Sequence, residues 1–395
     1  MAKNLVKILS AGTILTLVCS SGTLAQQVIE SSMKQVLPHG KTATRPPMGW
    51  IAPAGAEFDE AAVREIADAL VSSGLAAAGY VYVSIPDSWQ GERDASGNLR
   101  SGSRFPDIAK LAAYLHDKGL KLSLPASPGS TTCANTPGSF GHEEQDAKIF
   151  ASWGIDQLIY DWCGAEADYG RPGMPAAYQK MAKALAAAGR PILFGAARLS
   201  PLLSDWPALS GLNFWNVERL PPSWRAVEAA GFDAGPPAMN GRGAGRWYYP
   251  GELHVGNDNL SPAEQRSQMA LWSLLPAPLF FSADPRKLTP DALAILRNPD
   301  VIAVNQDEAD RPGWRVTKWM DKDVWARQLA SGEYVLGLFN RGDSVLDIRV
   351  KWKDLDQSGS FQVRELWSGK DRGRWSERFT TKVEPHDVAL ILIKR

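Results

Sequence analysis

The apolar residues of this chain follow two different periods. Between residue 48 and about residue 305, short apolar runs alternate with segments whose apolar residues recur every three or four positions, as in an amphipathic helix. Val63, Ile66, Ala67 and Leu70 show the helical spacing, and residues 80–84 (YVYVS) follow as an expected strand. The alternation recurs along the chain, with further helices expected at residues 108–115, 174–188 and 262–275 and further strands at residues 120–124, 192–194, 212–215, 252–253 and 279–281.

This alternation predicts an α/β fold. About eight strand-then-helix units in roughly 260 residues match the size of a (β/α)8 TIM barrel. A doubly wound open sheet is the competing architecture, but no strand is followed by the glycine fingerprint of a dinucleotide site. We therefore predict a catalytic barrel over residues 47–311.

The helical period disappears after about residue 312. Strands are expected instead at residues 324–328, 334–339, 346–352, 361–367 and 388–393, with turn residues such as 340–343 and 357–359 between them. This pattern predicts a C-terminal antiparallel β-sandwich over residues 312–395.

The N-terminus has the features of an export signal. Lys3 and Lys7 precede an apolar stretch, residues 8–19, that is too short to span a bilayer, and residues 22–25 (GTLA) offer small side chains for cleavage after Ala25. A lipoprotein signal through Cys19 is disfavoured, because Val18 before it is not small. We expect a signal peptide over residues 1–25, a linker over residues 26–46, and a secreted or periplasmic protein without a membrane span.

Composition narrows the possible partners. Lys plus Arg equals Asp plus Glu, 43 against 43, so the chain has no basic footprint for nucleic acid. Fifteen tryptophans suit either a carbohydrate-handling protein or ordinary core packing. After signal cleavage only Cys133 and Cys163 remain, which in an oxidising compartment indicates either one disulfide or two buried thiols.

Asp161 is the most informative candidate for chemistry. Residues 157–160 (QLIY) form an expected buried strand, and Asp161 stands at its carboxyl end, where barrel enzymes place their catalytic groups. From this pattern alone, the carboxylate is either a nucleophile or general base, or the cap of the next helix.

Several motifs resemble glycoside hydrolase family 27, the α-galactosidase or melibiase family. They cover nearly the whole mature chain in order: residues 47–50 (PMGW), 72–80, 87–89 (DSW), 104–106, 118–122, 132–147, 268–272, 277–279 and 300–307. The resemblance implies retaining glycosidases on a (β/α)8 barrel with a C-terminal β domain. It also implies that Asp161 is the nucleophile and that Cys133 and Cys163 form a disulfide beside it. Trp50 and Asp87, with Trp89 next to them, would line the sugar pocket.

The chain departs from the family pattern mainly in the sugar site. Pro86 replaces the first of two consecutive Asp residues, Ile159 replaces a Lys, Ala197 replaces a Glu or similar polar group, and Gly251 replaces an Asp. Aligned on residues 223–224, the acid/base Asp of the family falls on Arg219 and an Arg four residues earlier falls on Trp215. Each lost charged contact is worth on the order of 1.5–3 kcal/mol. We therefore expect a pocket altered for a sugar other than plain galactose.

The second carboxyl group of the mechanism is the open position. Glu218 adjoins the aligned position and is the candidate acid/base, and Glu252 is the next candidate; an ordinary salt bridge to Arg219 or Arg246 is the alternative for both. We expect Asp161 to face a pocket walled by Trp50, Asp87, Trp89 and Trp215. Arg219 should line the same pocket and bind an acidic or strongly hydrogen-bonding group.

The remaining polar candidates point away from cofactors. His142, Glu143 and Glu144 suggest a metal cluster at first sight, but they fit the start of a helix better, and His254 fits a structural role. We expect neither a metal nor a cofactor, and a carbohydrate as the substrate. Two alternatives stay open: a non-catalytic carbohydrate-binding relative, which Arg219 favours, and a lyase or transglycosylase that uses the same nucleophile.

Overall fold

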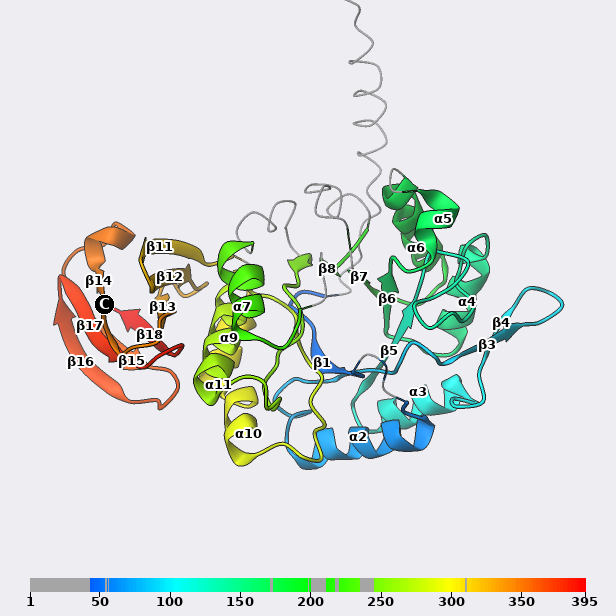
Figure 1. The fold of residues 1–395 in the computed structure, drawn as a ribbon, viewed down its shortest axis with the longest axis horizontal. Helices are drawn as coiled ribbons and strands as arrows, with labels where there is room; N and C mark the ends of the chain where they lie inside the picture. Colours follow the sequence, from blue (N-terminus) through cyan, green and yellow to red (C-terminus); the bar gives the residue numbers. More distant parts are fainter. Residues whose placement is uncertain are drawn as a thin grey trace, which may run out of the picture. The chain divides into compact units, whose positions relative to one another are not determined.

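The barrel is built from eight parallel strands. A computed structural model of the chain describes residues 43–53, 55, 57–170, 173–197, 199, 211–216, 220–234, 245–309 and 311–395 (Figure 1). The expected signal peptide and most of the expected linker lie outside these residues. The strands pair in the order β10-β1-β2-β5-β6-β7-β8-β9. Their bounds are β1 Met48–Ile51, β2 Tyr82–Ser84, β5 Lys121–Ala126, β6 Gln157–Asp161, β7 Leu193–Ala197, β8 Phe214–Trp215, β9 Trp247–Tyr248 and β10 Leu279–Phe281.

The two edges of this sheet meet through the segment that follows β9. Leu253 forms a parallel bridge with Phe281, and its amide donates to the Phe280 carbonyl at 2.6 Å. The predicted barrel is therefore confirmed, but the predicted strand at residues 252–253 is wrong. The paired strand lies at Trp247–Tyr248, and residue 253 contributes a single bridge.

Helices follow the strands at the spacing that the sequence predicts. In α2 (Glu60–Ser72), Val63, Ile66, Ala67 and Leu70 are all fully buried, and the Asp59 side chain caps the helix by accepting from the Ala62 amide. The other helices of the barrel are α3 Ile108–Asp117, α4 Glu143–Ser152, α5 Ala165–Tyr169, α6 Met174–Ala187, α7 Trp224–Val227, the π-helix η3 Glu228–Asp233, α9 Pro262–Leu274, α10 Pro290–Leu296 and α11 Pro299–Asn305. A hairpin that the periodicity did not predict, β3 Gln90–Arg93 with β4 Leu99–Ser101, extends from the loop after β2.

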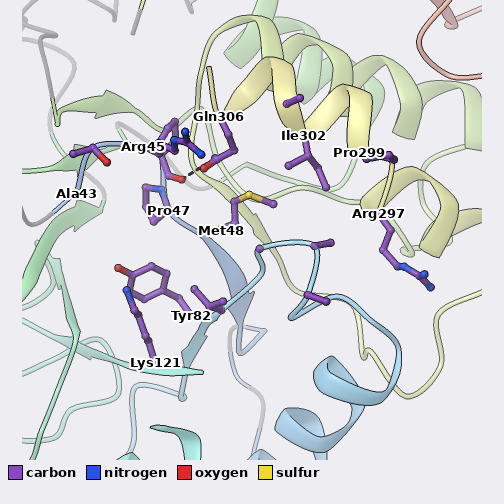
Figure 2. Close-up of a pocket in the computed structure, with 17 residues that line it drawn as sticks. Ala43, Arg45, Pro47, Met48, Tyr82, Lys121, Arg297, Pro299, Ile302 and Gln306 are labelled. Carbon is purple, nitrogen blue, oxygen red and sulfur yellow. Dashed lines mark hydrogen bonds between the residues drawn. The ribbon is translucent and has the colours of Figure 1, made fainter. Parts of the chain in front are cut away.

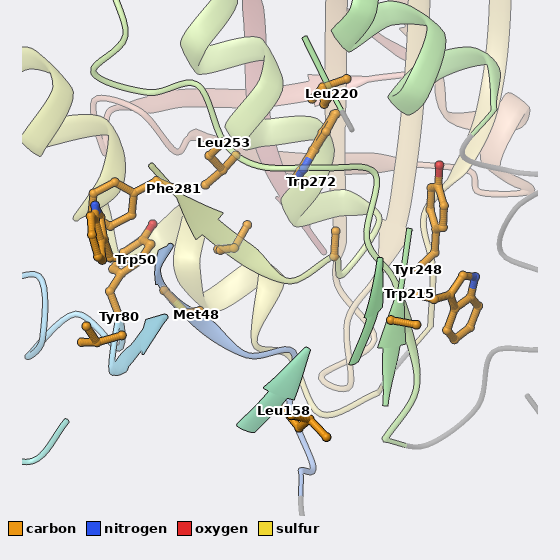
Figure 3. Packing of buried hydrophobic residues seen from close by; sticks show 14 of the residues in the cluster. Met48, Trp50, Tyr80, Leu158, Trp215, Leu220, Tyr248, Leu253, Trp272 and Phe281 are labelled. Carbon is orange, nitrogen blue, oxygen red and sulfur yellow. The ribbon is translucent and has the colours of Figure 1, made fainter. Parts of the chain in front are cut away.

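Each barrel strand presents two faces, because successive side chains point to opposite sides. Trp50 pairs in register with Val83 and Phe281, and Trp215 with Tyr248; all of these belong to the large core cluster between strands and helices (Figure 3). The alternate residues face the barrel interior. Their registers include Gln157 with Leu193, Ile159 with Gly195, and Gly195 with Phe214.

The C-terminal domain is the predicted β-sandwich. A six-stranded sheet has the order β11-β12-β13-β18-β15-β16, and β14 pairs with β17 in a second sheet. The strands are β11 Trp314–Trp319, β12 Lys322–Gln328, β13 Tyr334–Asn340, β14 Leu346–Lys351, β15 Ser360–Glu365, β16 Asp371–Ser376, β17 Arg378–Val383 and β18 Val388–Lys394. Of these, β11, β16 and β17 were not predicted from the sequence.

Helix α9 connects the two domains. It contacts β12, β13 and β18. Nine of its residues are buried, namely Gln265 and every residue from Ser267 to Leu274. Ion pairs add to the contact: Arg341 Nε lies 2.8 Å from Glu228 Oε1, and Arg315 Nη2 lies 3.8 Å from Asp233 Oδ1. The described part of the chain contains no helix with the length and apolarity needed to cross a bilayer.

Candidate active site

A pocket of about 550 Å³ opens at the carboxyl ends of the barrel strands. The last residues of four strands line it, namely Ile51, Ser84, Asp161 and Ala197, which places the pocket at the end where barrel enzymes carry their catalytic groups. Its volume falls within the usual range for small-ligand sites. Four carboxylates line this pocket: Glu57, Asp87, Asp161 and Glu252.

Asp161 reaches the pocket because of its parity along β6. Residues 157, 159 and 161 face the barrel interior, while Leu158 and Tyr160 are fully buried on the helix side. The carboxylate is half-buried, and its Oδ2 lies 3.6 Å from Cys133 Sγ. Asp161 is therefore a strand-end carboxylate at the wall of a ligand-sized cavity, as the sequence predicted.

A disulfide joins the two loops beside Asp161. Cys133 and Cys163 are bonded, with their Cα atoms 5.0 Å apart, so the predicted disulfide is present. The Ser127 hydroxyl donates to the Cys163 carbonyl, and Gly164 (φ +71°) approaches Thr131 so closely that a Cβ would lie 2.4 Å from the Thr131 oxygen. Covalent and close backbone contacts thus fix the chain immediately after the carboxylate.

Asp87 lines the same pocket from the loop after β2. Its Oδ2 accepts from the Ala134 amide at 3.1 Å, and its Oδ1 accepts from Gln90 Nε2 at 3.5 Å. Burial raises the pKa of Asp87 above its usual value, against the lowering effect of these hydrogen bonds. The group can accept hydrogen bonds from ligand hydroxyls when it is ionised.

Comparison with known proteins agrees with this arrangement. Residues 55–307 match the family model described as alpha galactosidase A, and residues 320–393 match the alpha galactosidase C-terminal beta sandwich domain. Alpha-galactosidase 2 of Arabidopsis thaliana is 34% identical over 378 residues, covering 93% of this chain and 94% of its own. An alpha-galactosidase of Coffea arabica is 36% identical over 357 residues, covering 88% and 93%. The chain belongs to the α-galactosidase family.

Structural similarity extends over both domains. The crystal structure of alpha-galactosidase I from Mortierella vinacea has a TM-score of 0.84 and 29% identity, covering 90% of this chain and 98% of that one. The chain is thus a glycoside hydrolase of the α-galactosidase family, with a barrel and a β-sandwich.

Three tryptophans do not lie where the sequence analysis expected them in this family member. Trp50 and Trp89 are fully buried, with their indole N–H groups bonded to the carbonyls of Ala283 (3.1 Å) and Pro125 (2.8 Å), and neither lines the pocket. Trp215 is also buried and lies beside Tyr248 of the neighbouring strand (Figure 3). Of the four residues expected to wall the pocket, Asp87 lines it and the three tryptophans do not. Trp50 and Trp215 point to the other side of their strands, and the hydrogen bond to the Pro125 carbonyl holds Trp89 in the core.

The acid position lies outside the described part of the α-galactosidase-family barrel. Glu218 and Arg219, the two residues considered there, both fall in residues 217–219, which the structure does not describe. Glu252 is described and lines the pocket together with Asp161. Glu252 comes shortly after β9 in the chain, and among the described residues it is the acidic residue from that segment that lines the pocket.

The substituted sugar-site positions do line the pocket. Pro86, Ile159, Ala197 and Gly251 are all in its wall. Gly251 has a φ of +128°, and a Cβ there would lie 2.4 Å from the Leu220 Cβ. A side chain at residue 251 therefore requires both a strained backbone and displacement of Leu220.

The histidine candidates have structural surroundings. His142 precedes α4, and Glu143 at the helix start pairs with Lys180 at 2.6 Å and accepts from the Tyr169 hydroxyl at 2.6 Å. His254 is buried, and its amide donates to Gln268 Oε1 at 2.8 Å. The ligand atoms of Cys133, Cys163 and Asp161 lie within 4.8 Å of one another, but the two sulfurs are bonded to each other and offer no thiolate to a metal.

Sequence reasoning missed several residues of the pocket. Glu57 and Arg104 line it and form an ion pair at 3.2 Å. Asn216 and Tyr249, the residues that follow β8 and β9, line it as well. Side chains two residues apart in a strand point to the same face. Because Phe214 points into the barrel, the sequence could have indicated that Asn216 does so too. No local pattern marks Glu57 or Arg104, which meet through loops far apart in sequence.

A second cavity, of about 650 Å³, lies at the amino ends of the strands. Met48 and Lys121, the first residues of β1 and β5, line it (Figure 2). Its charged lining residues among those described are the cations Arg45, Lys121 and Arg297, and the Lys121 ammonium lies 5.1 Å from the centre of the Tyr82 ring.

Proposed function

We propose that this chain is a secreted retaining glycosidase that hydrolyses terminal glycosidic bonds of a pyranoside related to galactose, with Asp161 as the nucleophile. The observation that carries the proposal is a strand-end carboxylate in the wall of a ligand-sized pocket, in a chain that belongs to the α-galactosidase family. The substrate class follows from the names of the relatives. The signal peptide over residues 1–25 and the division at residues 311/312 are part of the same proposal.

The reaction proceeds in two displacements. The ionised Asp161 carboxylate attacks the anomeric carbon, the bond from that carbon to the leaving oxygen breaks, and a second carboxyl group gives its proton to that oxygen. Water then attacks the anomeric carbon, the second group takes a proton from the water, and the ester to Asp161 breaks. The sugar leaves with its original anomeric configuration, and both carboxyl groups return to their starting states.

Asp87 holds the sugar in this scheme. Its carboxylate is oriented by the Ala134 amide and Gln90, which leaves remaining acceptor capacity for hydroxyl groups of the substrate. Because a pyranose presents adjacent hydroxyls, one carboxylate can accept from two of them. Asp87 therefore contributes chiefly to binding and orientation.

Two residues compete for the role of acid. Glu218 adjoins the position aligned with the acid/base residue of the family, and Glu252 lines the pocket that contains Asp161. An acid is needed most when the leaving group is a poor one, since activated aryl leaving groups depart with little proton transfer. The leaving group therefore distinguishes the acid from a residue that only binds.

The test compares Glu218→Gln and Glu252→Gln on two substrates of the same sugar, an aryl glycoside with a good leaving group and a disaccharide. Substitution of the acid should lower kcat/KM on the disaccharide by about 100-fold or more, and on the aryl glycoside far less. If one variant shows this difference, that residue is the acid. If both variants hydrolyse both substrates at the rate of the wild type, neither residue is.

A non-catalytic carbohydrate-binding protein is the second candidate function. Arg219 at the aligned acid position favours it. Such a protein would bind sugars in the same pocket but turn over no member of a broad panel, aryl glycosides included. Turnover of a single aryl glycoside that Asp161→Asn abolishes would exclude it.

A further inference from the structure

Gln90 lies behind Asp87, outside the lining of the carboxyl-end pocket. It is the first residue of β3, which follows Asp87 closely in the chain, and it is buried. Its Nε2 donates to Asp87 Oδ1 at 3.5 Å and to the Pro125 carbonyl at 3.4 Å. Because Asp87 lines the pocket and Gln90 does not, Gln90 acts on a ligand only through Asp87.

The two ends of the Gln90 amide face different kinds of partner. Its Oε1 accepts from the Thr136 hydroxyl at 3.0 Å. The Pro125 carbonyl and an ionised Asp87 carboxylate can only accept, so the amide nitrogen must face them. The Thr136 hydroxyl supplies the proton that the amide oxygen needs. Thr136 therefore fixes which end of the Gln90 amide faces Asp87.

Thr136 belongs to a closed turn that also holds the other oxygen of Asp87. The Thr132 amide donates to the Thr136 carbonyl at 2.8 Å, and the two hydroxyl oxygens lie 2.8 Å apart. Ala134, inside this turn, donates its amide to Asp87 Oδ2 at 3.1 Å. The turn thus supports one oxygen of the carboxylate directly and the other through Gln90.

These contacts oppose the cost of burying a charge at Asp87. Burial raises the pKa of Asp87, whereas hydrogen bonds from Thr132, Ala134 and Gln90 lower it. An amide donor favours the ionised carboxylate, which has the greater capacity to accept from substrate hydroxyls. Gln90 therefore favours the form of Asp87 that suits sugar binding.

The other charged groups around the pocket come from other elements. They are Asp161 at the end of β6, Glu252 after β9, and the ion pair of Glu57 with Arg104. Arg93, on the same strand as Gln90, is paired with Asp146 at 2.7 Å. Exchanging one uncharged side chain for another at residue 90 or 136 removes none of these charges. A changed titration of Asp87 in such a variant is therefore attributable to the lost hydrogen bond.

We propose that Gln90 and Thr136 are positioning residues that keep Asp87 ionised and so extend substrate binding to lower pH. This inference rests on the proposed function, because it takes Asp87 as the residue that binds sugar hydroxyls. Gln90 supplies the donor, and Thr136 sets the orientation of the amide. Neither residue contacts the bond that breaks, so both act on KM rather than on kcat.

Gln90→Met keeps the length of the side chain and removes both polar ends. The Pro125 carbonyl stays bonded, because the Trp89 indole N–H donates to it at 2.8 Å. With 4-nitrophenyl α-D-galactopyranoside, the pH below which KM rises should move upward. On the acid side of the wild-type midpoint, KM should increase by about 3- to 10-fold and kcat should change less than about twofold. An unchanged pH profile of KM would overturn the proposal.

A double variant separates an effect through Asp87 from a general effect on the fold. In the Asp87→Asn background, Gln90→Met should not alter the pH profile of KM further, because the titrating group is gone. An alteration as large as in the wild-type background would show that Gln90 does not act through Asp87.

Thr136→Val and Thr136→Ser form a matched pair. Valine has nearly the shape of threonine without its hydroxyl, whereas serine keeps the hydroxyl. Thr136→Val should shift the KM profile in the same direction as Gln90→Met, and Thr136→Ser should keep the wild-type profile. The same profile in both variants would show that Thr136 does not orient Gln90.

Carboxyl-carbon NMR separates this inference from the proposed function. In protein labelled with ¹³C-aspartate, the Asp87 signal is the one lost in Asp87→Asn, and its titration is followed without substrate. A midpoint at higher pH in Gln90→Met than in the wild type supports the role of Gln90, even if no glycoside is hydrolysed and the proposed function fails. An unmoved midpoint overturns the inference and leaves hydrolysis by Asp161 untouched. A midpoint that moves without a matching change in KM also overturns it, because Asp87 then does not bind the substrate.

Discussion

The two ends of the barrel differ in charge although the same strands build both. The carboxyl-end pocket is lined by Glu57, Asp87, Asp161 and Glu252, with Arg104 as a counter-charge. The charged residues among the described lining of the amino-end cavity are Arg45, Lys121 and Arg297. Cavity size does not separate the two ends, because the two volumes are similar, at about 650 Å³ and about 550 Å³.

This comparison teaches that chemistry rather than volume identifies the site. Retaining hydrolysis needs one carboxylate that attacks and one carboxyl group that gives a proton, and only the carboxyl-end pocket has several such groups among its described residues. The loops at that end are also held together by a disulfide. The predictions below test whether function belongs to that end alone.

The largest effect should come from Asp161→Asn. An amide cannot form the covalent intermediate, so kcat should fall by about 10⁴-fold or more. The melting temperature, followed by circular dichroism, should stay close to that of the wild type, because Asn keeps the size of the side chain. Residual kcat above about 1% in a carefully purified sample would remove Asp161 from the role of nucleophile.

Loss of the disulfide should have the next largest effect. Cys133 and Cys163 are 30 residues apart in sequence, and a crosslink at that separation contributes about 3–4 kcal/mol in the chain-entropy account. The Cys133→Ser/Cys163→Ser double variant should unfold at lower denaturant concentration by about that free energy. Reduction of the wild-type protein is the matched control and should give the same shift; an unchanged unfolding midpoint in both would contradict the prediction.

Asp87→Asn should raise KM by about 10- to 100-fold with a smaller change in kcat, because the residue binds hydroxyls rather than the reacting bond. Since burial raises the pKa of Asp87, its ionised fraction falls at pH values where an ordinary aspartate is still charged. KM of the wild type should therefore rise as the pH falls through this raised pKa, and the variant should lack that rise. A pH-independent wild-type KM across that range would refute the assignment.

The raised pKa of Asp87 also affects stability: a rise in pH improves substrate binding by this residue but lowers its contribution to the free energy of unfolding. A carboxyl group whose folded pKa is raised binds its proton more tightly in the folded state, so its cost to stability is absent at low pH and is present once the pH exceeds the folded pKa. Asp87→Asn should therefore not lower the free energy of unfolding at neutral pH by this route. Denaturant unfolding of the wild type and of Asp87→Asn, at one pH below and one pH above the raised pKa, measures this difference in the free energy of unfolding.

The smallest effect should come from the amino end. Lys121→Ala and Arg297→Ala remove two cations from the amino-end cavity, and both side chains are exposed. Neither residue lies at the carboxyl end, so kcat/KM should stay within about twofold of the wild type. A loss of activity without a loss of stability would show that the amino end contributes to function.

Periodicity predicted the fold well because burial enforces it. The helical spacing of Val63, Ile66, Ala67 and Leu70 gave α2, and the change of period near residue 312 gave the β-sandwich. Short strands were harder: β9 has two residues, Trp247 and Tyr248, too few to show an alternation. The strand was predicted at residues 252–253 instead, where Leu253 forms only a single bridge to Phe281.

The site was predicted in part, and strand parity explains the errors. Asp161 and Asp87 line the pocket, as expected. Trp50 and Trp215 were assigned by motif alone, yet each lies on the helix-facing side of its strand, one residue away from an interior position. Residues such as Arg104 and Glu57 meet through the tertiary fold, and no local pattern could have paired them.

The contact between Leu220 and Gly251 constrains how this pocket can change by mutation. A carboxylate at residue 251 would need a Cβ 2.4 Å from the Leu220 Cβ, at a backbone φ of +128°. Single substitutions at residue 251 should therefore be eliminated for their folding defect before their effect on substrate choice can be seen. The order of events matters: residue 220 must become small first, so libraries of single variants will miss this route and paired libraries at residues 220 and 251 can find it.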